Sequence, residues 1–269
     1  MSEPTSKELD VARTAATAAT DIINRYRSDG FAVHTKDEST ATINMVSEAD
    51  LAAETAIVET IRRTFPDHEF LAEETFSAPT DADHLWVIDP LDGTTNFVHG
   101  LEHVGISIAY YQSGRPVCGL VVNPLRDEWY TAIRGTGAWL NGERVEVADH
   151  TDLTQALIGV GFYYDRGEMM KATLAAVSEL FQQNIHGIRR FGTASLDLCM
   201  VGCGKLGAFF EYQLSPWDFA AGRLFIEEAG GKVTTCDGKD LPLSVSTVLA
   251  SNSRLHDLVL QVSQKYMLK

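Results

Sequence analysis

The spacing of apolar residues predicts two helices at the start of the chain. Between residues 7 and 27, apolar side chains recur every three or four positions, at Leu9, Ala12, Ala16, Ala19, Ile23 and Tyr26. This is the period of an amphipathic helix. Residues 48–65 repeat the period, and Ser47 stands where it could cap that helix, with Asp50 three residues later. The polar stretch 30–46 between the two helices is typical of a loop or a hairpin.

After Pro66 the pattern changes to the short apolar runs that are typical of strands. "HEFLAEE" (68–74) and "LWVIDP" (85–90) are the first two such runs. Residues 103–147 then contain β-rich runs separated by the turn sequences "QSGR", "NPLRD" and "LNGE". We therefore expect residues 1–148 to form an α+β half, in which helices pack on a largely antiparallel sheet.

From residue 149 onward, strand and helix patterns alternate. The expected strands are "ALIGVGF" (156–162), "HGIRRF" (186–191), "GAFFEY" (207–212) and "GKVTT" (231–235). The expected helices are residues 167–183, 193–203, 216–229 and 253–267. This alternation predicts an α/β half over residues 149–269. Because no repeat or low-complexity linker separates the halves, we expect them to pack tightly against each other.

Composition and charge exclude several classes of function. The chain has 269 residues, of which 22 are Lys or Arg and 37 are Asp or Glu, so its net charge is 22 − 37 = −15. Such a charge repels nucleic acids and anionic membranes, so we expect neither as a main partner. The sequence contains no uncharged apolar stretch of about 18 residues, so we expect neither a signal peptide nor a membrane span. The four cysteines form no CxxC pair and read as buried thiols. We expect a cytoplasmic protein.

The acidic motif "DPLDGTTNF" (89–97) is the first candidate for chemistry. Asp92-Gly93 could be a simple turn, the Glu73-Glu74 pair a solvated strand end, and Asp218 a helix cap. These readings do not explain Asp89, which follows an apolar strand and stands close to Asp92. Two ionised acids in a partly buried place repel each other unless a cation or a proton lies between them. Mg²⁺, which binds carboxylates together with substrate phosphate, satisfies this condition.

The residues after the second acid of the motif suggest an anion site. If a short helix starts at Gly93-Thr94-Thr95, its free N–H groups attract an anion, and the glycine lets a phosphate oxygen approach the backbone. His99 and His103 have the spacing of zinc ligands on a helix, but Gly100 and the strand-like run after His103 argue against one continuous helix. Carboxylates before the turn and an anion site after it describe a phosphate site.

Four motifs together resemble the inositol monophosphatase family of metal-dependent, lithium-sensitive phosphatases. They are "EE" (73–74), "WVIDPLDGTTNFVHG" (86–100), "HGIRRFGTASLDL" (186–198) and "WDFAAGRLFIEEAGG" (217–231), and the resemblance runs from about residue 50 to residue 252. It implies a layered αβαβα sandwich, Mg²⁺ as the cofactor, a small phosphorylated polyol or sugar as the substrate, and a homodimer.

The resemblance also implies roles for individual acids. Glu73, Asp89 and the main-chain carbonyl of Leu91 would share one metal, and Asp92 and Asp218 would bind another. Glu73, Asp50 and Thr94 would orient the attacking water. Backbone groups of Gly93 and Thr94 would hold the phosphate. Polyol hydroxyls would be bound by Asp92, Gly192, Thr193, Ala194 and Glu211.

Two positions depart from the family pattern. Ala72 stands where relatives often have Gly, which is tolerated if this position does not need a positive φ. The stretch 35–50 is longer than its usual counterpart, so Lys36 is not assigned to the site. Glu211 fits the family pattern, but its position alone is equally consistent with an exposed residue at the end of a strand.

The leading hypothesis is therefore a Mg²⁺-dependent phosphatase that hydrolyses inositol monophosphate by means of activated water. Members of the family with the same metal core hydrolyse fructose bisphosphate, histidinol phosphate or phosphoadenosine phosphate. These esters are therefore alternative substrates. A phosphatase with an aspartyl nucleophile would read Asp-x-Asp-Gly-Thr, whereas the spacing here is Asp-x-x-Asp. A partner-binding regulatory protein on the same fold is an alternative of another class.

Overall fold

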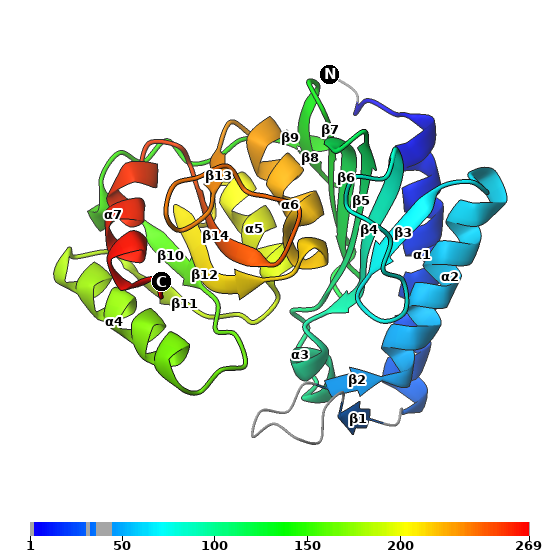
Figure 1. Cartoon of the computed structure of the whole chain (residues 1–269), viewed down its shortest axis with the longest axis horizontal. Helices are drawn as coiled ribbons and strands as arrows, with labels where there is room; N and C mark the ends of the chain where they lie inside the picture. The colour runs from blue at the N-terminus through cyan, green and yellow to red at the C-terminus, as the bar shows by residue number, and fades with distance from the viewer. Residues whose placement is uncertain (1–2, 31–32, 36–44, 269) are drawn as a thin grey trace.

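Five layers of helices and sheets make up the molecule (Figure 1). The computed structural model describes residues 3–30, 33–35 and 45–268. One outer layer consists of α1 (Lys7–Asp29) and α2 (Glu48–Thr64), which lie side by side on a seven-stranded sheet. Helices α5 (Ala194–Gly202) and α6 (Pro216–Glu228) lie between this sheet and a five-stranded sheet. The expected αβαβα sandwich is confirmed.

The seven-stranded sheet carries most of the N-terminal half, and its strands follow one another in chain order. They are β3 (Glu69–Ala72), β4 (His84–Asp92), β5 (Gly105–Gln112), β6 (Arg115–Asn123), β7 (Glu128–Ile133), β8 (Gly137–Leu140) and β9 (Glu143–Val145). Only β3 and β4 run parallel in this sheet, which confirms the largely antiparallel arrangement. Short strands β1 (Val33–Thr35) and β2 (Met45–Ser47) pair antiparallel, as the hairpin reading expects. The side chain of Ser47 lies outside the described part of the chain.

The five-stranded sheet has the order β11-β10-β12-β14-β13. Its strands are β10 (Leu157–Val160), β11 (Gly187–Arg189), β12 (Ala208–Leu214), β13 (Lys232–Thr234) and β14 (Ser246–Ser251). Helices α4 (Glu168–Gln182) and α7 (His256–Tyr266) cover its outer face (Figure 1), and the 3₁₀ turn η1 (Leu153–Gln155) precedes β10. Strand β14 was missed, because its short run "STVLAS" shows no clear alternation.

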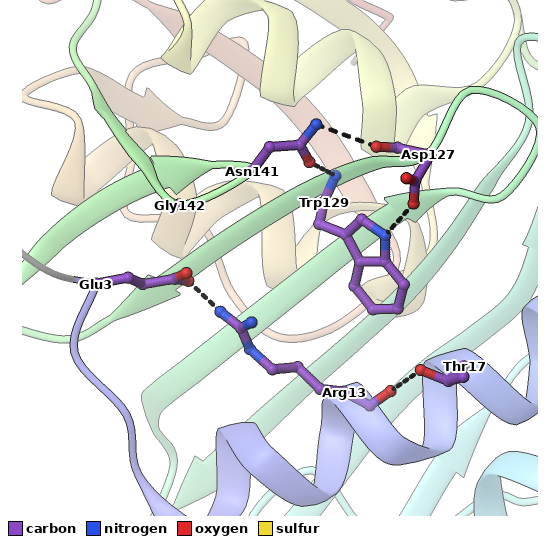
Figure 2. A pocket seen from close by; sticks show the side chains of 7 residues that line it. All are labelled: Glu3, Arg13, Thr17, Asp127, Trp129, Asn141 and Gly142. Atoms are coloured by element: carbon purple, nitrogen blue, oxygen red, sulfur yellow. Dashed lines mark hydrogen bonds and ion pairs between the residues drawn. The ribbon is translucent and has the colours of Figure 1, made fainter.

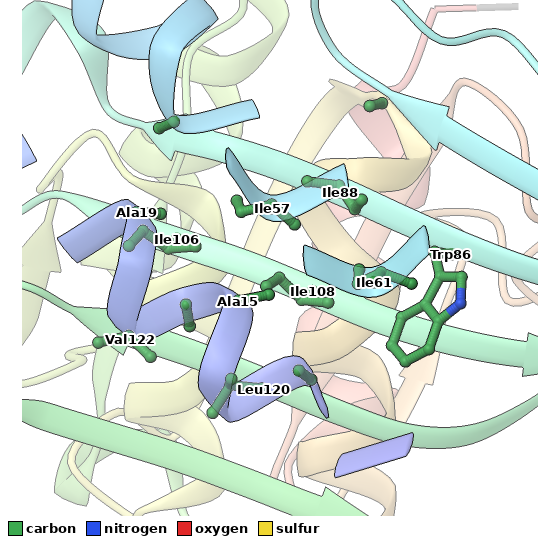
Figure 3. Packing of buried hydrophobic residues seen from close by; sticks show 14 of the residues in the cluster. Ala15, Ala19, Ile57, Ile61, Trp86, Ile88, Ile106, Ile108, Leu120 and Val122 are labelled. Atoms are coloured by element: carbon green, nitrogen blue, oxygen red, sulfur yellow. The ribbon is translucent and has the colours of Figure 1, made fainter. Parts of the chain in front are cut away.

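The small residues of α1 allow the outer helices to lie close to the seven-stranded sheet. Ala15 and Ala19 of α1 and Ile57 and Ile61 of α2 point into an apolar layer (Figure 3). The sheet contributes Trp86, Ile88, Ile106, Ile108, Leu120 and Val122 to this layer. All of these side chains are buried, which accounts for the three- to four-residue period of both helices.

The two sheets share the central helices. Helix α6 contacts β5 and β6 of the first sheet and β13 and β14 of the second. The division of the chain at residue 148 stays a prediction. None of the helices in the described ranges is long and apolar enough to span a membrane.

Candidate active site

A cleft of about 1030 Å³ gathers the predicted site residues from distant parts of the sequence. Its walls come from the end of β4, the short helix α3 (Thr94–Val98), the start of α5, the end of β12 and the start of α6. Every predicted site residue except Asp50 lines it: Glu73, Asp89, Leu91, Asp92, Gly93, Thr94, Gly192, Thr193, Ala194, Glu211 and Asp218.

An irregularity at the end of β4 brings its two acids to the same cleft. Residues three apart on a regular strand point to opposite faces of the sheet. The pairing of β4 with β5 shifts register between Asp89 and Asp92, so the strand departs from that rule here. The N–H of Leu91 donates to Oδ1 of Asp89 over 3.0 Å and fixes the turn. The Asp-x-x-Asp spacing therefore serves one site because the strand is irregular.

Asp218 combines the two roles that the sequence offered for it. The N–H of Ser215, the N-cap of α6, donates to Oδ2 of Asp218 over 2.7 Å. Asp218 also lines the cleft. The capping hydrogen bond fixes the side chain of Asp218 at the start of α6. The same carboxylate therefore caps the helix and lines the cleft.

Burial, and after it the charge of neighbouring acids, raises the pKa of Asp89, Asp92 and Asp218. Burial, followed by the charges of Glu73, Asp92 and Asp218, holds the pKa of Asp89 well above its usual range. The pKa of Asp218 is raised in the same way, by burial and then by Asp92 and Glu73. Burial raises the pKa of Asp92 to about 6, although hydrogen bonds from Ser195 oppose the rise. This is the repulsion that the sequence predicted, and a proton or a cation would relieve it.

The donor set of the cleft fits a hard divalent cation in its chemistry. Carboxylate and carbonyl oxygens are the ligands that Mg²⁺ prefers, and the predicted ligands Glu73, Asp89, Leu91, Asp92 and Asp218 offer only oxygens, while the imidazole of His99 also lines the cleft. Among the described residues, however, no three His, Cys, Asp or Glu side chains are arranged so that they could already hold a metal ion.

Gly93 forms the turn between the acids and α3. Its φ of +89° is unfavourable for any residue with a side chain, and a Cβ at this position would collide with Oγ1 of Thr193. The hydroxyl of Thr94, the first residue of α3, donates to Oδ1 of Asp50 over 2.9 Å. Asp50 is fully buried and lies behind the cleft wall. The short helix expected after the motif is thereby confirmed.

Helix α2 supplies a second buried acid, which the sequence analysis missed. Glu54 is only 1% exposed and accepts hydrogen bonds from the N–H of Glu74, over 2.8 Å, and from the hydroxyl of Thr75. It lies one helical turn after Asp50. The sequence signal was an acid four residues after Asp50, on the face of α2 that also carries the apolar residues.

Hydrogen bonds that involve backbone groups connect the start of α5 to Asp92 and to His103. The N–H of Ser195 donates to Oδ2 of Asp92 over 2.7 Å, and the hydroxyl of Thr193 donates to the carbonyl of His103 over 2.6 Å. His103 also lies 3.0 Å from Asp197, whereas His99 is exposed after the end of α3. The two histidines do not share a helix, as expected.

Glu211 faces the cleft rather than bulk solvent. It is 8% exposed, and burial raises its pKa to about 8, partly offset by the charge of Arg190. A Cβ at Gly161 would collide with its carboxylate, so the glycine leaves the space that the acid occupies. The reading of Glu211 as an exposed strand end is therefore wrong. Gly161 and Arg190 were not predicted as cleft residues.

A second cavity, of about 580 Å³, shares no lining residue with the first (Figure 2). Its polar groups largely bond to each other: Glu3 pairs with Arg13, and the indole N–H of Trp129 donates to Asp127 over 2.8 Å. Asn141 accepts from the N–H of Trp129 over 2.7 Å. The hydroxyl of Thr131 in β7 donates to Glu3, so the N-terminal segment is bonded both to α1 and to the sheet, and the cavity has a structural role.

The two departures from the family pattern have different outcomes. Ala72 lies in β3 and is not among the residues with positive φ, so a side chain is tolerated there. Lys36 lies outside the described residues.

The cysteines carry no disulfide, and Cys118, Cys199 and Cys236 are buried while Cys203 is partly exposed.

Known proteins with similar sequences and structures cover almost the whole chain. The sequence model of the inositol monophosphatase family matches residues 5–268. The Nus factor SuhB of Pseudomonas aeruginosa is 40% identical over 96% of both chains. Inositol monophosphatase 2 of Solanum lycopersicum is 38% identical over 93% of this chain and 95% of that protein. The crystal structure of the extragenic suppressor protein suhB from Bartonella henselae superposes with a TM-score of 0.89 and 34% identity, over 97% and 99% of the two chains. This protein belongs to the inositol monophosphatase family.

Proposed function

We propose that this protein is a Mg²⁺-dependent phosphomonoesterase that hydrolyses inositol monophosphate to inositol and inorganic phosphate. The observation that carries the proposal is the convergence of Glu73, Asp89, Asp92 and Asp218 on one cleft, beside a glycine turn that opens α3. Mutually repelling carboxylates with oxygen-only donors match a site that binds hard cations and a phosphate ester together.

The bound ions would supply Lewis acidity and charge compensation for the phosphoryl group. Glu73, Asp89, the carbonyl of Leu91, Asp92 and Asp218 would hold them.

The chain itself would position the attacking water. Because the hydroxyl of Thr94 donates to Asp50, its oxygen is left to accept a hydrogen bond from water. The carboxylate of Glu73 would accept the second proton of that water and aim its oxygen at phosphorus. The N–H groups of Gly93 and Thr94, in the first turn of α3, would donate to the phosphate.

The polyol would lie beside the phosphate. Asp92, Glu211 and the segment 192–194 line the cleft and offer two carboxylates and backbone groups to hydroxyls. Thr193 lies against Gly93, so the phosphate and the polyol would occupy neighbouring parts of the cleft.

Phosphate release from inositol 1-phosphate by the purified protein is the direct test. We expect activity with Mg²⁺, none with excess chelator, and inhibition by lithium in about the millimolar range, as the family resemblance implies. A panel with fructose bisphosphate, histidinol phosphate and phosphoadenosine phosphate tests the related substrates. Turnover of one of these alone would move the proposal to that substrate and leave the hydrolytic site unchanged.

A partner-binding role is a second candidate, because the relative from Pseudomonas aeruginosa is named a Nus factor. Every predicted ligand position holds a residue with a competent side chain or carbonyl, which favours the enzyme. A protein without activity on all of these esters, yet with its carboxylates intact, would support the partner-binding role instead. A cytoplasmic location and a homodimer remain expectations.

A further inference from the structure

The guanidinium group of Arg27 connects the outer helical layer to the short helix α3. Its Nη1 donates to the carbonyl oxygen of Phe97 over 3.0 Å, and its Nη2 donates to the carbonyl oxygen of Gly100 over 2.6 Å. Arg27 lies in the last turn of α1, at the end of the molecule where α3 also lies (Figure 1). Because Arg27 does not line the cleft, its effect on the site must pass through α3.

Helix α3 needs such support because it has only five residues. A helix of this length is unstable by itself, and the carbonyl groups of its last turn have no partners within the helix. These carbonyl groups also give the end of the helix a partial negative charge, which a cation stabilises. The last turn of α3 contains no basic residue of its own. Arg27 therefore supplies from α1 the cation that the sequence of α3 lacks.

The residues at the end of α3 suit an arginine rather than a lysine. Gly100 has a φ of +83°, and a Cβ at this position would make a tight contact of 3.3 Å with Nη2 of Arg27. The guanidinium carbon also lies over the ring of the fully buried Phe97, 6.0 Å from its centroid. A guanidinium donates in two fixed directions and stacks on a ring, whereas an ammonium group is a single point charge.

Asn96 fixes the same helix from another side. Its Nδ2 donates to the carbonyl oxygens of His103, over 2.7 Å, and of Phe191, over 2.8 Å. Asn96 thus connects α3 to the segments before β5 and α5, while Arg27 connects it to α1. Thr94 is the first residue of this helix, so the orientation of its N–H and hydroxyl groups depends on how the helix is held.

We propose that Arg27 is a positioning residue for the turn that binds the phosphate. It holds α3 so that the N–H groups of Gly93 and Thr94 and the hydroxyl of Thr94 keep the orientation that phosphate and the attacking water require. Within the described part of the chain, Arg27 makes no hydrogen bond to β4 or α6, which carry three of the metal-binding acids. Its effect should therefore be on phosphate rather than on the metal. The inference rests on the proposed phosphatase function.

The test measures phosphate binding, catalysis and the Mg²⁺ requirement separately in Arg27→Ala. We expect kcat/KM for inositol 1-phosphate at saturating Mg²⁺ to fall about ten- to a hundredfold, the size of effect that a small displacement of reacting groups has. The calorimetric dissociation constant of inorganic phosphate, with Mg²⁺ present, should rise about tenfold. The Mg²⁺ concentration for half-maximal activity should stay within about twofold of the wild-type value.

Two further variants separate positioning from loss of charge and from loss of fold. Arg25→Ala removes the same charge from an exposed position of α1 and should change none of these quantities. Arg27→Lys keeps the charge without the paired donors, so its kcat/KM should lie between those of wild type and Arg27→Ala. If Arg27→Ala does not fold, Arg27→Lys carries the same comparison of phosphate binding with the Mg²⁺ requirement.

The outcomes distinguish this inference from the proposed function. Wild-type values of kcat/KM and of phosphate binding in a folded Arg27→Ala overturn the inference and leave the proposed function intact. A rise in the Mg²⁺ requirement as large as the loss of phosphate affinity also overturns it, because Arg27 then supports the cleft as a whole. A wild-type protein that binds phosphate with Mg²⁺ but hydrolyses no ester defeats the proposed function, and weaker binding in Arg27→Ala would still support the role of Arg27. Absence of both activity and phosphate binding in wild type defeats both.

Discussion

The N–H of Glu74 donates a hydrogen bond of 2.8 Å to Oε2 of Glu54, a buried acid on α2. The second oxygen of Glu54 accepts from the hydroxyl of Thr75. One turn earlier on the same helix, Asp50 accepts from Thr94 at the start of α3. One face of α2 therefore fixes two separate walls of the cleft, the turn after β3 and the turn after β4. Helix α2 supports the site from behind, because neither Asp50 nor Glu54 lines the cleft.

We predict that Glu54→Gln weakens the response to Mg²⁺ more than it weakens substrate binding. An amide cannot accept at both positions, so the turn that carries Glu73 should shift, and one donor left unpaired costs about 1–3 kcal/mol of folding free energy. We expect kcat to fall about tenfold, the Mg²⁺ concentration for half-maximal activity to rise, and KM for the ester to stay constant. Titration calorimetry of Mg²⁺ provides a readout that does not depend on turnover.

The control for Glu54 lies on the same helix. The side chain of Glu59 is 63% exposed, so Glu59→Gln should change neither stability nor the Mg²⁺ response. Loss of stability in Glu54→Gln with an unchanged Mg²⁺ dependence would limit Glu54 to a role in folding.

Much of the fold follows from local patterns in the sequence. The period of α1 and α2 predicted their buried faces because small and apolar residues must meet the sheet along one stripe. The turn sequences predicted the meander because Gly, Asn and Asp permit tight reversals. Strand β14 was missed because it pairs with β12 and β13, which are distant in the chain, and its own run is short. Non-local pairing leaves little trace in a single short segment.

The site could be predicted where chemistry determines the residue type. Acids that repel each other, a glycine at a turn and a Trp-Asp pair are visible in the sequence. Glu54 was not found because its role depends on N–H groups beyond β3, and backbone donors have no sequence signature. Tyr163 and Leu174 were not predicted as cleft residues for another reason. An exposed apolar residue is ordinary in a sequence and becomes informative only when the structure shows that it lines a cleft.

Replacing a cleft carboxylate should abolish activity and leave the fold intact. Asp92→Asn and Asp218→Asn each remove one charge from a group whose members raise one another's pKa. We expect no measurable phosphate release at saturating Mg²⁺ and, because repulsion is relieved, a higher melting temperature of the metal-free protein. Asp81→Asn, at an exposed position outside the cleft, is the control. Near-normal turnover in either cleft variant would contradict the assignment of these acids to a metal site.

Water rather than a carboxylate should be the nucleophile. The irregular end of β4 holds Asp89 buried and accepting from the N–H of Leu91, which does not suit a group that must reach phosphorus. We therefore expect no phosphorylated enzyme after rapid acid quenching with labelled substrate. A phosphoryl group trapped on Asp89 or Asp92 would establish the aspartyl-nucleophile mechanism.

The stability of the metal-free protein should fall as pH rises. Asp92 has a folded-state pKa of about 6 and Glu211 one of about 8, both raised by burial above their ordinary values of 3.8 and 4.5. A raised pKa means that the neutral form favours folding, so this stability is present at low pH and is lost as each group ionises. We expect the melting temperature to decrease between about pH 5 and pH 8.5, and Mg²⁺ to restore it at the upper end.

Variants assign the pH effect to individual groups. Glu211→Gln should make the decrease shallower up to about pH 8, and Asp92→Asn only up to about pH 6, while the raised pKa values of Asp89 and Asp218 leave part of the decrease in both variants. A melting temperature that rises with pH over the whole range would contradict the raised pKa values.

Glu211 should distinguish a polyol phosphate from a simple ester. It is buried in the middle of β12 and lines the cleft, so its carboxylate can accept hydrogen bonds from ring hydroxyls. Glu211→Gln should lower kcat/KM for inositol monophosphate by the value of a charge-assisted bond, about 1.5–3 kcal/mol, and leave hydrolysis of an aryl phosphate almost unchanged.

Gly161→Ala should reproduce this phenotype without altering the acid itself. A methyl group at Gly161 would collide with the carboxylate of Glu211, and the free end of that flexible side chain can move while the backbone stays in place. We expect a selective loss on inositol monophosphate in kcat/KM and little change in melting temperature. Equal losses on both esters, in either variant, would mean that Glu211 supports the metal site or the fold. Unchanged values on both esters in Glu211→Gln would show that the substrate does not contact this carboxylate at all.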